Sequence, residues 1–310
     1  MNVPLLAARR YFFSKRLPGP VNIMAGVAVG GILVGTAALV IVLSVFNGFQ
    51  QLLKELYGRF DPDLVVRAET GRTFPVPGPA LDSLQQAGQV AAYSKVLRGK
   101  AILRYHERQR IVELLGVDSS FLKVSDADEL VQHGQFRLQD GLGLPRIVLG
   151  AGVEYYTNAK LNDLQTPMEL FTVSGKRDPI ASDPSSVINK AYVAAAGVFS
   201  IQKEYDERYV LSDIKVARKL FEEPQHVSAL WLRMPADAPL EATRDAIQAG
   251  LPPGLVVETW YEQHRTLYEV MQNEKAVGYL IIAFMLLLTA ANIIGSLTML
   301  VLDRKSTRLN

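Results

Sequence analysis

The side chains that most often carry out catalysis are few in this chain and lie far apart. It has no cysteine and only four histidines, His106, His133, His226 and His264. Glu107 follows His106, but no second histidine stands at the spacing of a zinc site. Phosphate-binding loops and nucleophile elbows have no counterpart either. We therefore predict that the chain is not an enzyme, and that it holds no metal and no cofactor of its own.

The chemistry that the sequence does show is that of helix packing inside a membrane. Two overlapping pairs of glycines, four residues apart, stand in an apolar segment near the N-terminus. Small residues at this spacing let two helix backbones approach closely. We therefore expect close helix packing at these four glycines: Gly26, Gly30, Gly31 and Gly35.

A second pattern of this kind lies near the C-terminus. Thr289, Asn292 and Ser296 stand at positions i, i+3 and i+7 of another apolar segment. Polar side chains at membrane depth normally face protein or a cavity, because lipid offers them no hydrogen-bond partner. We expect Asn292 and Ser296 to pack against helices, some of which lie outside this chain.

Two segments without any charged residue must position these side chains. They run from Leu17 to Leu53 and from Ala276 to Leu302. Each is longer than the roughly 20 residues that cross the hydrocarbon core of a bilayer. A core helix of a soluble protein would show a polar stripe, which residues 21–46 lack. A cleaved signal peptide would have a shorter apolar part and an A-x-A site. We therefore interpret both segments as membrane spans.

Charge predicts how the spans are oriented. Basic residues precede the first span and follow the second: Arg9, Arg10, Lys15, Arg16, Arg304, Lys305 and Arg308. Lysine and arginine next to a span stay on the cytoplasmic side. Both ends of the chain should therefore be cytoplasmic, and the large domain between the spans lies on the other side. That outer domain is slightly acidic although the whole chain has a net charge of +2, which argues against nucleic-acid binding.

Both membrane helices are predicted to extend beyond the bilayer. Apolar residues continue at helical spacing through 47–61, where Asp61 and Pro62 end the helix. On the return side, 263–275 contains no proline or glycine and runs directly into the second span. A helix from 263 to 302 would be about 60 Å long, roughly twice the hydrocarbon thickness. We predict two stalk helices; the alternative is two ordinary domain helices next to the membrane.

The outer domain should be α+β and should contain two strand–helix–strand units. The expected elements are 63–68, 80–86 and 89–97 in the first unit, and 227–234, 240–249 and 255–260 in the second. Each helix begins after a proline and ends before a glycine, as helices often do. A β-rich subdomain is inserted between the units. A hairpin (100–105 and 109–117) is expected directly after the first unit. The inserted subdomain is expected to contain a helix (150–159), strands (169–173 and 187–199), and a helix (213–221) with Ser212 as its N-cap.

These signals divide the chain into nine segments. They are a cytoplasmic amphipathic N-terminus (1–20), the first membrane helix (21–46), a stalk helix (47–61), the first part of the outer domain (62–117), an inserted subdomain (118–225), the second part of the outer domain (226–262), a second stalk helix (263–275), the second membrane helix (276–302) and a cytoplasmic tail (303–310).

Several sequence runs resemble a known family of permeases. They are Ala8–Tyr11 (ARRY), Gly35–Phe49 (GTAALVIVLSVFNGF), Gly197–Ser200 with Glu204–Asp206, Glu274-Lys275 before the second span, and Asn292–Ile294 inside it. Together they resemble the lipoprotein-releasing (Lol-type) ABC transporter permeases, a branch of the group that includes FtsX-like and MacB-like permeases. The resemblance extends over nearly the whole chain. It implies a periplasmic outer domain with the porter-plus-sabre arrangement, in which 62–117 and 226–262 form the porter-like subdomain and 118–225 the sabre-like subdomain.

The resemblance also implies partners and a location. The chain would be a multi-pass permease subunit in the bacterial inner membrane, paired with a second permease subunit that is either a copy of itself or a paralogue. A separate cytoplasmic ABC ATPase would hydrolyse the ATP. A cavity between the first spans of the two permeases would take a lipoprotein from the surrounding membrane lipids and pass it to a periplasmic lipoprotein carrier.

Two sets of site residues follow from this resemblance. Acyl chains of the lipoprotein would contact apolar positions near the outer ends of the spans: Val42, Phe46, Phe49, Met271 and Leu280. The carrier would dock on the polar loop 175–186, through Lys176, Arg177, Asp178, Pro179, Ile180 and Pro184.

The family differs from this chain after the second span. There the family continues into a short cytoplasmic helix and two further spans, whereas Ser306–Asn310 does not match it. We therefore expect a truncated permease whose last residues are not native. Two alternatives remain open. One is a mechanotransmitting FtsX/MacB-like permease that relays ATPase motion to a periplasmic partner without carrying lipoprotein. The other is a two-span sensor, which would need a signalling module that residues 303–310 cannot hold.

Overall fold

The computed structural model describes residues 20–139, 144–174, 188–235 and 238–307. The chain falls into two compact units. The first combines the N-terminal residues up to Leu52 with the C-terminal residues from Thr266. The second, Leu53–Arg265, contains the sheet; we keep the name outer domain for it.

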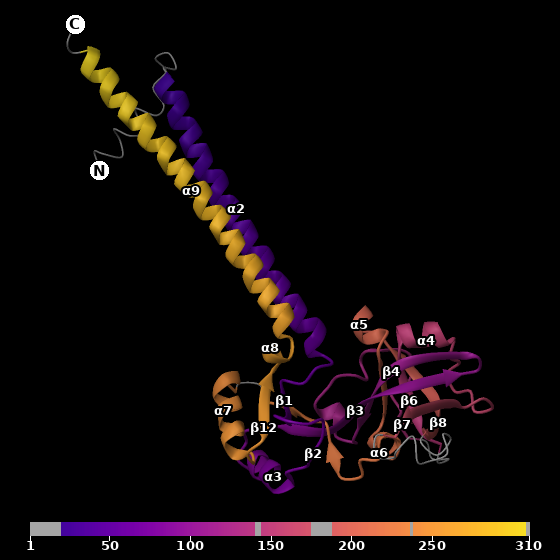
Figure 1. Ribbon diagram of the computed structural model, residues 1–310. Coiled ribbons are helices and arrows are strands. Elements are labelled where there is room, and N and C mark those ends of the chain that lie inside the picture. Colours follow the sequence, from indigo (N-terminus) through magenta and orange to yellow (C-terminus); the bar gives the residue numbers. More distant parts are fainter. Residues whose placement is uncertain (1–19, 140–143, 175–187, 236–237, 308–310) are drawn as a thin grey trace. The chain divides into compact units, whose positions relative to one another are not determined.

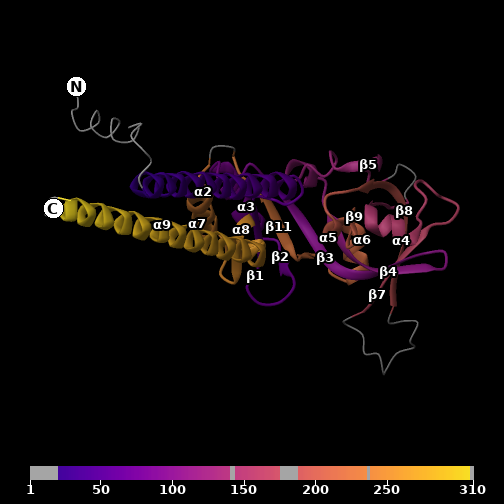
Figure 2. The ribbon, with the colours of Figure 1, turned by 90° about the horizontal axis from the view of Figure 1, so that it is seen from above.

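The first unit is a pair of long helices. They are α2 (Pro20–Gly58, 39 residues) and α9 (Arg265–Thr307, 43 residues). Figures 1 and 2 both show them side by side, and we call them the helix pair. Val29–Phe49 and Gln272–Ala291 are long and apolar enough to cross a membrane. At 1.5 Å per residue, each helix is about 60 Å long. As predicted, both helices continue well past the length that a bilayer requires.

One end of the outer domain contains the two predicted strand–helix–strand units. The strand order there is β12-β1-β11-β3, and every neighbouring pair is antiparallel. β1 and β3 are therefore parallel with β11 between them, while β11 and β12 are parallel with β1 between them. The elements are β1 (Leu64–Ala68), α3 (Gly78–Gln86), β3 (Ala92–Tyr105), β11 (Ala229–Arg233), α7 (Leu240–Gly250) and β12 (Leu255–Thr259). The two units thus interleave in one sheet (Figure 1).

The other end is a closed arrangement of strands. Starting from β3, the pairings run through β4, β9, β6, β8 and β7 and return to β3, which makes a ring of six strands. The added strands are β4 (Arg108–Val117), β6 (Arg146–Gly150), β7 (Met168–Val173), β8 (Ile188–Phe199) and β9 (Tyr209–Asp213), with β5 (Val131–Gly134) next to β8. β3 belongs both to the ring and to the interleaved units.

Short elements complete the outer domain. They are η1 (Phe121–Lys123), α4 (Ala151–Thr157), α5 (Lys203–Asp206), α6 (Ile214–Phe221), α8 (Trp260–Gln263) and a small two-stranded sheet, β2 (Phe74–Pro75) with β10 (His226–Val227). α6 packs closely on the sheet, because a Cβ added at Gly116 of β4 would lie only 2.3 Å from the Cβ of Ala217. The hydrophobic core includes Leu64, Leu103, Leu114, Ile147 and Val193, all fully buried.

The structure differs from the sequence prediction in several details. α2 ends at Gly58 and not at residue 61, and strands β6 and β9 were not predicted. The strands expected at 89–97 and 100–105 are one continuous strand, β3, since Gly99 does not interrupt it. The N-cap of α6 is Asp213 and not Ser212: the Asp213 carboxylate accepts a hydrogen bond of 2.7 Å from the backbone N–H of Lys215. The return helix does not begin at 263, because His264 has non-helical backbone angles and separates α8 from α9.

Candidate functional site

Close packing of the helix pair depends on one of the two glycine pairs. A Cβ added at Gly31 would lie 3.3 Å from Cγ2 of Thr289, and one at Gly35 would lie 3.9 Å from Cδ2 of Leu286. The Thr289 hydroxyl donates to the carbonyl of Met285 in its own helix, at 2.9 Å. Thr289 therefore faces α2 with its methyl group while its polar atom is satisfied. We call this contact line the seam.

The other glycine pair lies on a different face of α2. No described heavy atom comes within 4 Å of a Cβ added at Gly26 or Gly30. At about 100° per residue, this pair is rotated by roughly 140° from Gly31 and Gly35, since corresponding glycines are five residues apart. The structure thus uses one predicted packing surface within the chain and leaves the other uncovered by described residues. The side chains of Asn292 and Ser296 lie outside what the structure describes.

The predicted acyl-chain positions do not all lie together. By helical spacing Val42, Phe46 and Phe49 share the α2 face of the seam glycines. Val42 is part of the seam, with Cγ1 3.8 Å from a Cβ added at Gly278 of α9. Phe49 is 46% exposed and Phe46 is partly exposed. Leu280 stands about 200° around α9 from Gly278 and is highly exposed, so it faces away from the seam.

Other predicted positions fall outside the described residues. The side chain of Met271 is one of them. The whole docking loop is another, with Lys176, Arg177, Asp178, Pro179, Ile180 and Pro184. So are the amphipathic N-terminus up to residue 19 and the last three residues of the tail.

In the outer domain, sheet pairing brings together the two chain segments that continue into the long helices. β1 and β12 are antiparallel, and Leu64 at the start of β1 pairs with Thr259 at the end of β12. Asp61 precedes this pair and His264 follows it, so the two side chains meet. His264 Nε2 lies 2.9 Å from Asp61 Oδ2. The hydroxyl of Tyr205, from α5, donates to the same oxygen at 2.7 Å.

We call Asp61, Tyr205 and His264 the Asp61 junction. Asp61 is only 8% exposed and Tyr205 only 7%. A buried carboxylate is costly unless hydrogen bonds replace its water. The two side-chain contacts to Oδ2 supply that replacement, so the end of α2, the segment before α9 and α5 are held at one atom.

An aromatic cluster surrounds the residue next to this junction. Phe60 is 2% exposed, and its ring centroid lies 5.5–6.5 Å from those of Phe121, Phe199, Tyr205, Tyr209 and Trp231. Burial raises the pKa of the Tyr209 phenol, and the nearby Glu113 carboxylate raises it further. The backbone of the next residue back, Arg59, accepts a hydrogen bond of 2.8 Å from the N–H of Asp126. The chain just after α2 is therefore tightly fixed.

The short helix that supplies Tyr205 is held by its own neighbour. Asp206 accepts hydrogen bonds from the Ser200 hydroxyl at 2.7 Å and from the backbone N–H of Ile201 at 2.8 Å. Gly197–Ser200 and Glu204–Asp206 are the outer-domain runs that carry the resemblance in the sequence. The hydrogen bond between Ser200 of the first run and Asp206 of the second fixes α5, and α5 carries the Tyr205 that contacts Asp61.

The sequence prediction missed the junction, although its residues were noted separately. Asp61 was interpreted as the end of a helix and His264 as one of four dispersed histidines. The signal that could have linked them is symmetry. Each lies a few residues from a strand end, at 61 before β1 and at 264 after β12, and antiparallel neighbours bring such ends together.

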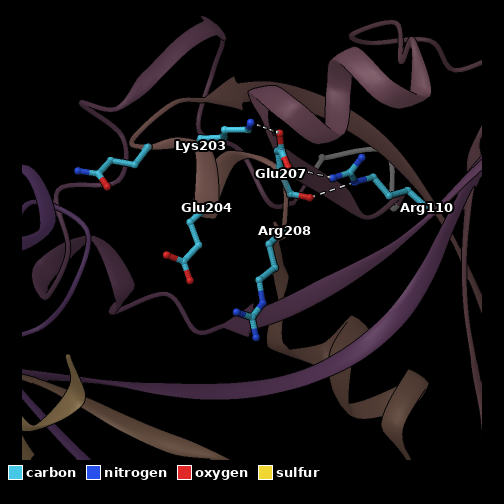
Figure 3. Close-up of a pocket in the computed structure, with 6 residues that line it drawn as sticks. Arg110, Lys203, Glu204, Glu207 and Arg208 are labelled. Carbon is cyan, nitrogen blue, oxygen red and sulfur yellow. Dashed lines mark hydrogen bonds and ion pairs between the residues drawn. The ribbon is translucent and has the colours of Figure 1, made fainter. Parts of the chain in front are cut away.

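Figure 3 shows a pocket of about 600 Å³ beside α5. Its lining residues are Arg110, Gln202, Lys203, Glu204, Glu207 and Arg208. Arg110 and Lys203 point toward Glu207, with N–O distances of 3.6 and 4.0 Å. Arg208 instead pairs with the buried Glu113 at 2.6 Å. Because acids offset the basic groups, the pocket has no strong charge preference. No cluster of three potential ligands for a metal occurs among the described residues.

Comparison with known proteins places the chain in a family. The model of the MacB-like periplasmic core domain matches residues 25–249. The chain belongs to this family. The MacB-like match covers most of α2, the six-stranded ring and the interleaved units apart from β12. The prediction of an α+β domain with two membrane helices in a MacB-like permease is confirmed. The chain is a membrane protein that carries a periplasmic core domain.

Named relatives of this MacB-like chain include two lipoprotein-releasing system transmembrane proteins. LolC of Neisseria meningitidis is 26% identical over 96% of this chain and 70% of its own length. LolE of Haemophilus influenzae is 24% identical over 98% of this chain and 72% of its own length.

Solved structures similar to the MacB-like chain were also found. The periplasmic region of MacB from Actinobacillus actinomycetemcomitans has a TM-score of 0.45 and 11% identity, covering 70% of this chain and 97% of that one. The extracellular domain of the ABC-type transporter YknZ from Gram-positive bacteria has a TM-score of 0.43 and 13% identity, covering 63% of this chain and 99% of that one.

Proposed function

We propose that this chain is a permease subunit of an ABC transporter that extracts lipoproteins from the inner membrane and hands them to a periplasmic carrier. The strongest support is the extent of its similarity to LolC and LolE, which covers 96% and 98% of the chain. The similarity therefore includes the helix pair as well as the core domain. Both relatives are named as parts of a lipoprotein-releasing system.

Physical cost explains why such a subunit needs partners. Each acyl CH₂ group contributes about 0.8 kcal/mol to membrane anchoring, so a lipoprotein leaves the bilayer only if another process supplies energy. In the proposal a separate cytoplasmic ATPase supplies it, and a second permease subunit closes the cavity. The uncovered face at Gly26 and Gly30 supports this, since it offers a close-packing surface to a helix outside the chain. Both ends of the chain are cytoplasmic in this arrangement, as their basic residues indicate.

The proposed lipid-contacting residues are the exposed ones of the predicted set. Phe46 and Phe49 offer apolar surface beyond the part of the seam that Val42 and Gly278 close. Leu280 offers a separate apolar surface on α9. Acyl chains bound at Phe46 and Phe49 would lie at the end of the span nearer the core domain, where they must leave the membrane.

A charged substitution at Phe46 tests this function. In vesicles containing the complete permease, its ATPase and an acylated lipoprotein, Phe46→Asp should reduce release to a soluble carrier at least tenfold. Ser44→Asp is the matched control, because Ser44 lies two residues away and about 160° around the helix. Protease protection of the core domain verifies insertion of both variants. Wild-type release by the Phe46→Asp variant would contradict the proposal.

A second candidate function is mechanical transmission without lipoprotein transport. The Asp61 junction favours it, because the chain segments that lead to both long helices meet at one buried carboxylate. The same experiment separates the two functions. A pure transmitter has no need of an apolar surface at Phe46, so Phe46→Asp would leave its coupling to the ATPase unchanged, and the wild-type protein would release no lipoprotein.

A further inference from the structure

One oxygen atom connects three distant parts of the sequence. Asp61 Oδ2 accepts the hydrogen bond of Tyr205 at 2.7 Å, and His264 Nε2 lies 2.9 Å from the same atom. Asp61 comes three residues after the end of α2, and His264 directly precedes α9. Tyr205 is in α5, which contacts β6 of the six-stranded ring. The two helix connections and the ring are thus joined at a single acceptor.

The surroundings make this connection stiff. Hydrogen bonds to a buried charged group are shorter and stronger than those between neutral groups, and removing one leaves the carboxylate partly unsatisfied. Phe60, next to Asp61, contacts five aromatic rings. His264 in turn has its ring 5.2 Å from that of Trp260, in α8. The segments that carry Asp61, His264 and Tyr205 are therefore held together by tight packing as well as by hydrogen bonds.

We propose that the Asp61 junction is the joint through which α2 and α9 move the six-stranded ring during each transport cycle. Asp61 is the positioning residue of this joint: it touches no substrate, and acts by keeping Tyr205 and His264 together. The idea rests on the proposed function for its link to transport, whereas the connection itself follows from the contacts. Loss of the joint should leave the ATPase running while its movement no longer reaches the core domain.

A similar hydrogen bond elsewhere in the same domain provides a matched control. The Tyr105 hydroxyl donates to Asp163 Oδ2 at 2.8 Å, and Tyr105 is 2% exposed. Like Tyr205→Phe, Tyr105→Phe removes one buried phenol hydrogen bond to an aspartate. Tyr105 lies in β3 and Asp163 follows α4, so this pair belongs to neither helix connection. A merely structural role at Asp61 would make both substitutions equivalent.

The test uses the complete permease assembled with its ATPase and partner subunit in vesicles. Because the chain has no cysteine, the spin labels attached at Tyr155→Cys in α4 and Leu287→Cys in α9 are its only ones; both positions are highly exposed, and neither belongs to the proposed lipid-contacting set. The distance between them is measured without nucleotide and with a trapped ATP analogue. ATP turnover and lipoprotein release are measured on the same samples.

Asp61→Asn and Tyr205→Phe should each abolish the nucleotide-dependent change in distance and lower release at least tenfold, with ATP turnover within twofold of wild type. Tyr105→Phe should leave all three readouts within twofold. Tyr205→Phe keeps the aromatic side chain and removes only its hydroxyl. This variant therefore tests the joint even if Asp61→Asn fails to fold. A normal distance change in Tyr205→Phe, or an equal loss in Tyr105→Phe, would overturn the joint. If wild type releases no lipoprotein, the transport function fails, but the distances still test the joint.

Discussion

The helix pair and the outer domain use opposite means of holding their parts together. In the helix pair, apolar side chains such as Val27, Leu280 and Leu287 are about two-thirds exposed, and contact depends on small residues at the seam. In the outer domain, apolar side chains are buried between a sheet and its helices. The buried Asp61 carboxylate there holds together the two segments through which the chain enters and leaves the domain. The comparison shows that one sequence is adapted to two solvents: lipid for the helices and water for the domain.

The sharpest way to test this contrast is a labelling experiment with an all-or-none outcome. Single cysteines at Tyr155 in α4 and at Ser306 near the end of α9 would be the only thiols of the chain. An impermeant maleimide applied to intact spheroplasts should label Tyr155→Cys fully, and Ser306→Cys only after the membrane is opened. Labelling of both sites in intact spheroplasts would disprove the proposed orientation.

Phenylalanine should contribute very differently to the two regions. Phe60→Ala removes a 2% exposed ring from the aromatic cluster and should lower the free energy of unfolding of the outer domain by about 3–5 kcal/mol. Phe284→Ala, at a position of α9 that is 59% exposed, should change it by less than about 0.5 kcal/mol. Urea unfolding in detergent, followed by the fluorescence of the buried Trp231, measures both values. Equal effects would contradict the burial of Phe60.

The contacts at the seam predict that Gly31 tolerates a larger side chain less well than its neighbour Gly30. Gly31→Leu places a side chain against Thr289 and should destabilise the helix pair by about 1–3 kcal/mol, the usual effect of overpacking. Gly30→Leu enters a space without described neighbours and should have little effect on the isolated chain. Crosslinking yield between cysteines introduced at Gly35 and Leu286 reports the pairing. A reversed order would place α9 on the other face of α2.

A smaller effect concerns alkaline pH. The pKa of Tyr209 is raised above its usual value of 10.0, mainly by burial. The folded state therefore disfavours ionisation, and this contribution is fully present below pH 10 and is lost as the pH rises further. Stability of the outer domain should fall above pH 10 by at most about 1.4 kcal/mol per pH unit for this one proton. Tyr209→Phe should flatten the stability profile in that range; an unchanged profile would contradict the assignment.

Much of the fold could be predicted because its signals are local. The long segments without charged residues predict the long helices. A proline at the start and a glycine at the end predict α3 and α7. Interleaving of the two units was not predictable, since it depends on which strands pair across more than 150 residues, as β1 and β11 do. The Ser212 prediction was wrong for a local reason: Ser212 and Asp213 can both cap a helix, and the backbone geometry decides between them.

The site was less predictable than the fold. Sequence spacing predicted both glycine pairs but could not tell which one α9 would occupy. The family resemblance supplied Val42 and Leu280 as acyl-chain positions. In the structure Val42 lies in the seam and Leu280 faces away from it, and their contact with acyl chains stays a prediction. The Asp61 junction was missed because its three residues acquire a common role only after β1 and β12 pair. Functional contacts between distant segments depend on topology, which hydropathy does not encode.

The most direct test of the central claim is photocrosslinking at Phe46 in living cells that contain the complete transporter. A photoreactive amino acid at Phe46 should yield a lipoprotein adduct, and the same residue at Ser44, on the opposite face, should yield at least fivefold less. The adduct should disappear when the partner ATPase is absent or when the lipoprotein cannot be acylated. If Phe46 gives no lipoprotein adduct although the chain is correctly inserted, or if Ser44 reacts equally, the account of this chain as a lipoprotein-releasing permease is contradicted.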